Sequence, residues 1–276
     1  MNERPRIITL TTDFGTSDAY VGIMKGVILS INPNARVVDI THTIPPQDIY
    51  EAAFSIYAAH SYFPEGTIHI IVVDPGVGSD RQAIVCHTEN AFFVCPDNGV
   101  LSYLLQNVEN EQKQPVDTVA IQNSAYYLSE VSNTFHGRDI FAPVAAHLSL
   151  GVRLDDIGPP AQTLVQLPIQ VPEFSGHTLT GQIVKIDRFG NAITNISETA
   201  IGRLESASTG EMSIYEIRVG SARLNRLNRA YAESGIGKPL AIIGSSGLLE
   251  IAINGGNAKE GLELKSGDSV VIQRFD

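Results

Sequence analysis

Residues 67–78, TIHIIVVDPGVG, carry the strongest fold signal in this 276-residue chain. Its first seven residues form a nearly continuous apolar run, which is typical of a strand covered on both faces. The run ends at Asp74, in a turn rich in glycine and proline. Ligands of open parallel sheets bind outside the carboxyl ends of the strands, so this turn is a candidate site.

The chain before this run repeats the strand pattern twice. Residues 6–12 and 36–41 are rich in β-formers and predict two further strands. A helix-spaced apolar stripe runs between Asp18, which can cap it, and Pro33, and a second stripe covers 48–62. The resulting strand–helix–strand–helix–strand order predicts a mostly parallel sheet with helices on both sides.

The chain after the run completes a first domain. We expect a hairpin from residues 82–87 and 91–95, then a helix at about 98–107. A strand near 117–121 and a helix from about 138 to 150 follow. This first domain is predicted to be α/β.

A change of pattern marks a second domain. Residues 158–175 contain four of the 14 prolines and little charge, which is typical of a linker. Short strands are expected beyond it at 177–187, 192–196, 211–220, 239–243, 247–253 and 269–274. We therefore predict an α/β N-terminal domain at 1–165, a linker at 166–175, and a smaller, β-rich, barrel-like domain at 176–276.

Composition and charge exclude several classes of protein. No run of 18 apolar residues exists, so a membrane span is excluded, and no signal peptide is visible. The net charge is −11, of which −10 falls in the first 165 residues, so binding to nucleic acid phosphates is disfavoured. The only two cysteines, Cys86 and Cys95, are expected to be buried free thiols, and the expected compartment is the cytoplasm.

Four polar residues of the first domain are candidates for chemistry. Asp13 and Asp74 each follow a predicted strand, and they face one crevice if those strands are parallel. Arg81 can keep a neighbouring carboxylate ionised, and His136 would lie at a helix N-terminus that favours a neutral imidazole. Each has a structural alternative: a helix cap, a turn-initiating Asp-Pro, a solvated arginine and a structural histidine. The other six histidines are expected to be structural.

The second domain offers two polar turns between strands. One contains Asp187, Phe189 and Asn191, and the other contains Ser245, with Glu250 shortly after it. A hairpin turn is the structural alternative for the first. No dinucleotide, Walker or metal-ligand fingerprint occurs in the chain, so we expect no cofactor and no metal.

Four segments taken together are not generic, namely TLTTDFG at 9–15, VVDPGVG at 72–78, TFHGRD at 134–139 and DRFGNAITN at 187–195. In this order and spacing the sequence resembles the S-adenosylmethionine (SAM) hydroxide adenosyltransferases, or SAM hydrolases, which are relatives of the SAM-dependent fluorinase and chlorinase. The resemblance covers essentially the whole chain, including the late segment GSSGLLEIA.

The resemblance implies a reaction and a set of residues. The reaction would be SAM plus water giving adenosine and L-methionine, and the family's catalytic trio falls on Asp74, Arg81 and His136. Its substrate-binding positions fall on Asp13 for the ribose, Asp187 for the methionine amino group, and Phe189, Asn191, Ser245 and Glu250. It also implies a homotrimer with active sites between the N-terminal domain of one subunit and the C-terminal domain of the next.

Two alternatives to a SAM hydrolase remain open. A SAM-dependent halogenase is disfavoured because the halogenases replace the acidic and basic members of the trio, whereas this chain retains all three. Asp74 would also place a negative charge where a halide should bind. The second alternative is a non-catalytic adenosine-binding or scaffold protein. If the protein is a hydrolase, we expect slow turnover, because no metal ion lowers the pKa of the attacking water.

Overall fold

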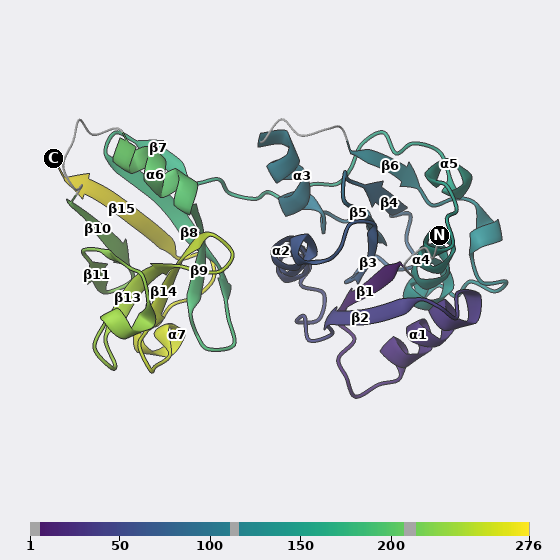
Figure 1. Cartoon of the computed structure of the whole chain (residues 1–276), viewed down its shortest axis with the longest axis horizontal. Helices are drawn as coiled ribbons and strands as arrows, with labels where there is room; N and C mark the ends of the chain where they lie inside the picture. Colours follow the sequence, from purple (N-terminus) through teal and green to yellow (C-terminus); the bar gives the residue numbers. More distant parts are fainter. Residues whose placement is uncertain (1–5, 111–115, 207–213, 276) are drawn as a thin grey trace. The chain divides into compact units, whose positions relative to one another are not determined.

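The structure is a computed structural model that describes residues 6–110, 116–206 and 214–275. The chain divides into two compact units, Met1–Ile169 and Gln170–Asp276. Figure 1 draws the first from purple to teal and the second from green to yellow.

The first unit is built on a six-stranded sheet with the order β2-β1-β3-β5-β4-β6. Its strands are β1 (Ile7–Thr12), β2 (Arg36–Thr41), β3 (Thr67–Val72), β4 (Ala83–His87), β5 (Ala91–Pro96) and β6 (Asp117–Ala120). Neighbours among β2, β1, β3 and β5 are parallel, and β4 runs antiparallel to both β5 and β6. The predicted α/β class and the predicted hairpin are confirmed.

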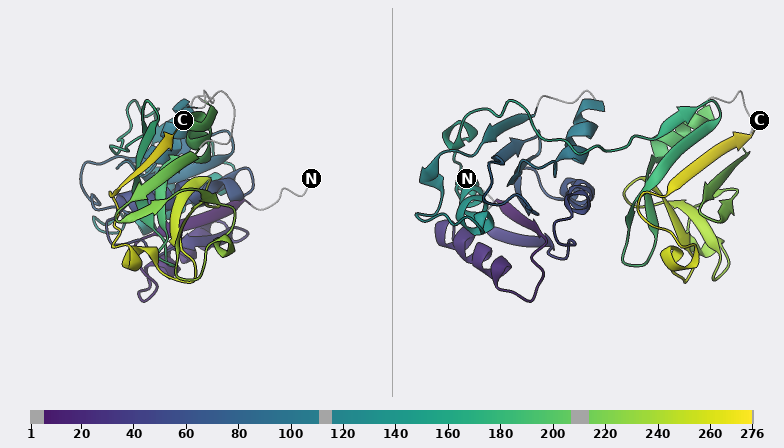
Figure 2. Two further views of the ribbon diagram at one scale, coloured as in Figure 1. Left: turned by 90° about the vertical axis from the view of Figure 1, so that its left-hand side faces the viewer. Right: turned by 180° about the vertical axis from the view of Figure 1, so that it is seen from behind.

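Helices cover both faces of this sheet, as the right-hand view of Figure 2 also shows. They are α1 (Tyr20–Ile31), α2 (Ile49–Ala59), α3 (Ser102–Asn110), α4 (Ala142–Ser149) and the short α5 (Leu154–Ile157). Helices α1 and α4 pack together on one face, over a core that includes Met24 and Phe141. Helices α2 and α3 pack on the other face, over Ile56 and Phe93. The β3 run is fully buried, as its composition predicts.

Two predicted helix starts are wrong. The first helix begins at Tyr20, and its N-cap residue, Ala19, makes no side-chain hydrogen bond, so Asp18 does not cap it. The helix expected from residue 98 begins only at Ser102, because Gly99 adopts a φ of +95° and forms a turn with Ser102. That left-handed conformation ends helical geometry and favours glycine.

The second unit is a strongly curled, barrel-like sheet with the order β11-β10-β15-β8-β9-β14-β13-β12, in which β7 pairs with β8 and β11 contacts β13. Its strands are β7 (Glu173–Ser175), β8 (Thr178–Ile186), β9 (Ala192–Ser197), β10 (Ile214–Val219), β11 (Ala222–Leu224), β12 (Leu227–Asn228), β13 (Pro239–Ile243), β14 (Leu248–Ile253) and β15 (Ser269–Phe275). The predicted β-rich class is confirmed, although residues 211–213 of one expected strand lie outside the described residues.

Two helices, α6 (Glu198–Ser206) and α7 (Ala258–Gly261), interrupt the strands of the second unit. The sequence pattern did not predict them. Helix α6 packs on β8 and β9, and its Ile201 and Leu204 close one end of an aliphatic core. An amphipathic segment of nine residues is too short to stand out among strands of similar length.

Both cysteines are free and buried, as predicted. Burial raises the pKa of the Cys86 thiol to about 12, so it stays protonated and unreactive at neutral pH. Within the described residues, no helix combines the length and the apolar character that crossing a bilayer requires.

Candidate active site at the carboxyl edge of the first sheet

The carboxyl ends of β1 and β3 lie side by side at one edge of the first sheet. Thr12 of β1 pairs with Val72 of β3 in parallel register, so Asp13 and Asp74 leave the sheet at the same edge. The expectation that these strands are parallel neighbours is confirmed. A cavity of about 390 Å³ opens at this edge, and Asp13, Asp74 and His136 all line it.

Arg81 joins Asp74 to His136 beside this cavity. Its Nη2 donates to Asp74 Oδ2 at 2.6 Å and to His136 Nδ1 at 2.7 Å, and its Nε lies 3.0 Å from both carboxylate oxygens. The side chains of Asp74 and Arg81 are only 4% and 11% exposed. Arg81 is therefore the centre of a buried ion pair, and not the solvated surface residue that was the alternative.

The contact with Arg81 determines how His136 is protonated. A guanidinium only donates hydrogen bonds, so Nδ1 of His136 must accept, and the neutral ring carries its proton on Nε2. Burial lowers the pKa of His136 below its usual range, and the charge of Arg81 lowers it further. The charges of Asp74 and Asp139 and a backbone hydrogen bond with Ser132 offset only part of this change. In this arrangement Nδ1 holds the guanidinium and is not free to take a proton from water.

A glycine lets the Asp74 turn approach the loop that ends at His136. Gly78 has a φ of +77°, and a Cβ atom there would collide with the carbonyl oxygen of Asn133. Only glycine combines this conformation with this proximity. Gly78 therefore brings the chain segment of Asp74 and Arg81 into backbone contact with the segment of His136.

Asp139 anchors the loop that precedes His136. It is fully buried, and its Oδ2 accepts hydrogen bonds from the backbone N and the Oγ of Ser132, both at 2.8 Å. Arg138 pairs with the same carboxylate. Asp139 lies in a π-helical turn, Gly137–Phe141, a feature found often at functional sites. Asp139 was not predicted as a site residue, because its burial and its contacts with Ser132 appear only in the folded chain.

Asp13 is held by a backbone group and not by a helix. Its Oδ2 accepts a hydrogen bond from the N–H of Gln47 at 2.8 Å. Gln47 has a φ of +66°, which is unusual for a residue other than glycine. Because α1 begins only at Tyr20, the alternative that Asp13 caps this helix is excluded. Asp13 instead lines the cavity.

Three aromatic rings form an apolar wall of the same cavity. Phe14, Tyr20 and Phe135 lie with their ring centroids 5.1 to 5.7 Å apart, in tilted and edge-to-face pairs. None of them was predicted as a site residue. Such a wall lowers the local dielectric constant and so strengthens the electrostatic interactions of Asp13 and Asp74 with a bound ligand.

In the second unit three of the predicted polar residues, Asp187, Asn191 and Glu250, lie close together. Asp187 accepts hydrogen bonds from the backbone N and the Nδ2 of Asn191, at 2.8 and 3.1 Å. Burial raises the pKa of Glu250 and the charge of Asp187 raises it further, while a 3.4 Å hydrogen bond from Tyr231 lowers it in part. Tyr231 was not predicted, since it lies 19 residues before Glu250 in a short segment without strand pattern. Phe189 is 76% exposed, and Ser245 lies in the turn between β13 and β14.

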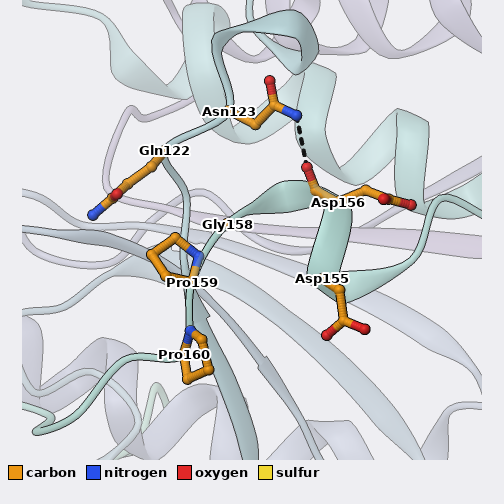
Figure 3. A pocket seen from close by; sticks show the side chains of 7 residues that line it. All are labelled: Gln122, Asn123, Asp155, Asp156, Gly158, Pro159 and Pro160. Atoms are coloured by element: carbon orange, nitrogen blue, oxygen red, sulfur yellow. Dashed lines mark hydrogen bonds between the residues drawn. The ribbon is translucent and has the colours of Figure 1, made fainter.

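Other possible sites in the described residues carry less chemistry. No three His, Cys, Asp or Glu side chains gather there as metal ligands. Figure 3 shows a second hollow of the first unit, lined by Asn123, Asp155 and Asp156, among others. Asn123 Nδ2 donates a hydrogen bond to the backbone carbonyl of Asp156, and Asp155 forms an exposed salt bridge with Arg153. This hollow contains none of the predicted site residues.

The fold and site define an α/β unit with a small-molecule site at its sheet edge, followed by a β-rich unit. The chain belongs to the SAM hydroxide adenosyltransferase family: residues 8–158 match the family's N-terminal domain, and residues 181–271 match its C-terminal domain.

Known relatives match the chain over nearly its full length. An (R)-S-adenosyl-L-methionine hydrolase of Thermus thermophilus is 38% identical, over 95% of this chain and 97% of its own. A fluorinase of an Actinoplanes species is 28% identical, over 97% of each chain. The crystal structure of a conserved protein from Thermotoga maritima superposes with a TM-score of 0.87 at 36% identity, covering 97% of this chain and 100% of that one.

Proposed function

We propose that the protein hydrolyses SAM to adenosine and L-methionine by direct attack of water on C5′. The observation that carries this proposal is the hydrogen-bonded Asp74–Arg81–His136 group beside a cavity that Asp13 also lines. The full-length relatives named as SAM hydrolases support the same reaction.

The reaction places few demands on the protein. A water oxygen forms a bond to C5′ while the C5′–S bond breaks. The electron pair of the C5′–S bond goes to the sulfur. The cationic sulfonium leaves as a neutral thioether, so the leaving group needs neither a general acid nor a metal ion. The water loses one proton to solvent or to a carboxylate. The protein must therefore orient one water in line with the breaking bond, in a dry cavity.

The three residues of this hydrogen-bonded group fit this task with separate roles. Asp74 accepts a hydrogen bond from the attacking water, because a carboxylate paired with Arg81 still has free lone pairs. Arg81 holds Asp74 in place and offsets the negative charge of the attacking oxygen once the water has lost its proton and become hydroxide-like. His136 orients Arg81 through Nδ1. We assign Asp13 to the ribose, because one carboxylate can accept hydrogen bonds from both hydroxyls of a vicinal diol.

We further propose that the active protein is a homotrimer. In it, the substrate would lie at the first unit of one subunit. Its nucleoside and its methionine amino group would be contacted by residues from the second unit of a neighbouring subunit, namely Asp187, Phe189, Asn191, Ser245 and Glu250. Sedimentation velocity gives the oligomeric state. Mixing inactive Asp74→Ala subunits with inactive Asn191→Ala subunits tests the sharing of sites, because only shared sites regain activity in mixed trimers.

The names of the hydrolase relatives specify the (R) configuration, and we propose (R)-SAM as the substrate. The sulfonium sulfur is a stereocentre, so with the ribose and C5′ held in place the two epimers direct the methyl group and the methionine chain differently. A site that fixes the ribose and the in-line water can therefore distinguish them. Turnover of each pure epimer, followed by chiral chromatography, measures this preference.

The decisive experiment incubates the purified, chelator-treated protein with SAM, with and without chloride, and separates the products by chromatography. Adenosine and methionine in both reactions are the expected result. A 5′-chlorinated nucleoside would favour the halogenase activity of the more distant fluorinase relatives. Unchanged SAM with adenosine bound would indicate a binding protein. Activity that returns only with added metal would contradict the proposed independence from metal.

A further inference from the structure

A series of hydrogen-bonded polar groups begins next to Asp13 with Thr12 and His42, two buried residues that do not line the cavity. Thr12, the last residue of β1, is fully buried, and His42 is 7% exposed. Thr12 Oγ1 lies 2.9 Å from His42 Nδ1, and the backbone N–H of Phe14 donates to Thr12 Oγ1 at 3.3 Å. Both chain neighbours of Asp13 are thus held by one hydroxyl group.

The series continues from His42 to a surface ion pair. Nε2 of His42 lies 3.0 Å from Asp39 Oδ1, off the ideal direction of a hydrogen bond, and Lys25 Nζ donates to Asp39 Oδ2 at 2.7 Å. Burial raises the pKa of Asp39, but contacts with Lys25 and His42 lower it by more, so this carboxylate is ionised at neutral pH.

An ionised Asp39 fixes which atom donates and which accepts in each hydrogen bond of this series. A carboxylate only accepts, so Nε2 of His42 faces Asp39 as the donor, and Nδ1 accepts from the hydroxyl of Thr12. The Thr12 oxygen then has a lone pair free for the Phe14 N–H. In this arrangement the Phe14 N–H, the Thr12 hydroxyl and His42 Nδ1 each have a partner, and Nε2 faces the Asp39 carboxylate, which leaves Thr12 a single hydroxyl orientation.

The backbone of His42 ties the same loops together a second time. Its carbonyl oxygen accepts from Gly15 N at 2.8 Å, where Gly15 has a φ of +70°. Five residues further on, the N–H of Gln47 donates to the Asp13 carboxylate. A movement of His42 would therefore shift both the backbone around Asp13 and the donor that orients its side chain.

A bulge in β2 puts Asp39 and His42 in position. Leu10 of β1 pairs with Asp39, but the next residue, Thr11, pairs with Thr41, so β2 carries one extra residue. Bulges of this kind change the direction in which the following side chains point and are enriched beside active sites.

We propose that Thr12, His42 and Asp39 are positioning residues that hold the Asp13 carboxylate in the orientation that binds the ribose diol. This inference rests on the ribose role proposed for Asp13. The three residues contribute to recognition of the two hydroxyls and not to attack on C5′.

The same strand contains a matched control. Thr9 Oγ1 lies 2.7 Å from His69 Nδ1, and both residues are fully buried. This Thr–His pair has the chemistry of the Thr12–His42 pair, but it starts three residues earlier on β1 and so points to the opposite face. Thr9→Val should cost stability as Thr12→Val does, without affecting Asp13.

The test measures dissociation constants of adenosine and 2′,3′-dideoxyadenosine by titration calorimetry. The wild type should prefer adenosine, and Asp13→Ala should lose this preference. Thr12→Val should reduce the preference by about tenfold, because a small displacement of a recognition group is costly. Thr9→Val should keep the wild-type preference within about twofold, at a similar loss of melting temperature.

Asp39→Ala is the second variant, since a side chain 40% exposed can be truncated without opening a core cavity. It should reduce the preference in the same direction as Thr12→Val. A wild-type preference in both Thr12→Val and Asp39→Ala, with the preference lost in Asp13→Ala, would overturn the positioning role alone. A wild-type preference in Asp13→Ala would overturn the proposed ribose role, and the positioning inference with it.

Discussion

Nδ1 of His136 lies 2.7 Å from Nη2 of Arg81, and this contact sets the protonation of the histidine. The same Arg81 nitrogen also donates to Asp74, so the guanidinium can stay in place only while Nδ1 carries a lone pair. A second proton on the ring would place two donors against each other. The Asp74–Arg81–His136 group is therefore intact only when His136 is neutral.

The first prediction concerns pH. The pKa of His136 is lowered from 6.5, so the neutral form predominates at pH 7. We therefore expect kcat not to change with pH between 7 and 8. As the pH falls through this lowered pKa, below 6.5, His136 gains a proton, the contact with Arg81 breaks, and kcat falls. A profile of kcat between pH 5 and 8 measures this. His136→Gln, whose side chain does not titrate, should lack the acid limb. An acid limb unchanged in His136→Gln would assign it to another group.

The second prediction separates chemistry from binding. Asp74→Ala should lower kcat by about 100-fold or more and change KM little, because Asp74 acts on the attacking water. Asp13→Ala should instead raise KM by about tenfold or more, because it loses charged hydrogen bonds to the ribose. Asp80→Ala is the control, since it removes an exposed acid from the turn that holds Asp74. Steady-state kinetics that show full activity in Asp74→Ala would contradict its assigned role.

The third prediction concerns the turn that carries Asp74. Gly78→Ala should destabilise the protein by about 1–3 kcal/mol and lower kcat, because its Cβ would push the turn away from Asn133. Gly26→Ala in α1 is the matched control: a Cβ there meets no atom within 4 Å, so stability should be unchanged or higher. Urea titrations and kinetics of both variants measure these effects. Equal effects of the two substitutions would refute the packing argument.

The fourth prediction concerns stability at acid pH. Burial, helped by the charge of His60, lowers the pKa of His69 from 6.5 to about 3. Between pH 3 and 6.5 the unfolded chain therefore binds more protons at this residue than the folded chain does. Its contribution to the free energy of unfolding is fully present above pH 6.5 and is lost as the pH falls toward 3.

The double variant Thr9→Val/His69→Phe tests this contribution, because it replaces both hydrogen-bond partners and keeps a ring against Phe93. Its free energy of unfolding, measured by urea titration at several pH values, should be close to that of the wild type at pH 7. It should fall less steeply than that of the wild type below pH 6. Parallel curves would show that His69 does not titrate in this range.

The sequence predicted those parts of the site that depend on strand pattern. The apolar run of β3 and the β-rich pattern of β1 predict parallel strands, and Asp13 and Asp74 lie just beyond their carboxyl ends. The bounds of β13, predicted at 239–243, likewise depend on local residues alone. These features are local, so a single sequence contains enough information to locate them.

The sequence could not predict contacts that join distant segments. Arg81 and His136 are 55 residues apart, and only the folded chain shows that one guanidinium serves both Asp74 and the histidine. The pattern around Asp39 and His42 reads as an ordinary strand end, because a β-bulge leaves no signature in hydrophobic alternation. Asp139 was overlooked for a similar reason, since its partner Ser132 lies in a loop.

The stereochemistry at C5′ tests the central claim most directly. SAM deuterated in one configuration at C5′ is turned over in oxygen-18 water, and the adenosine is analysed by mass spectrometry and NMR. Direct attack of water held by Asp74 predicts oxygen-18 in the 5′-hydroxyl, inversion at C5′, and unlabelled methionine. Retention at C5′, or adenosine without the label, would contradict direct attack and would indicate a covalent intermediate on a carboxylate such as Asp13 or Asp74.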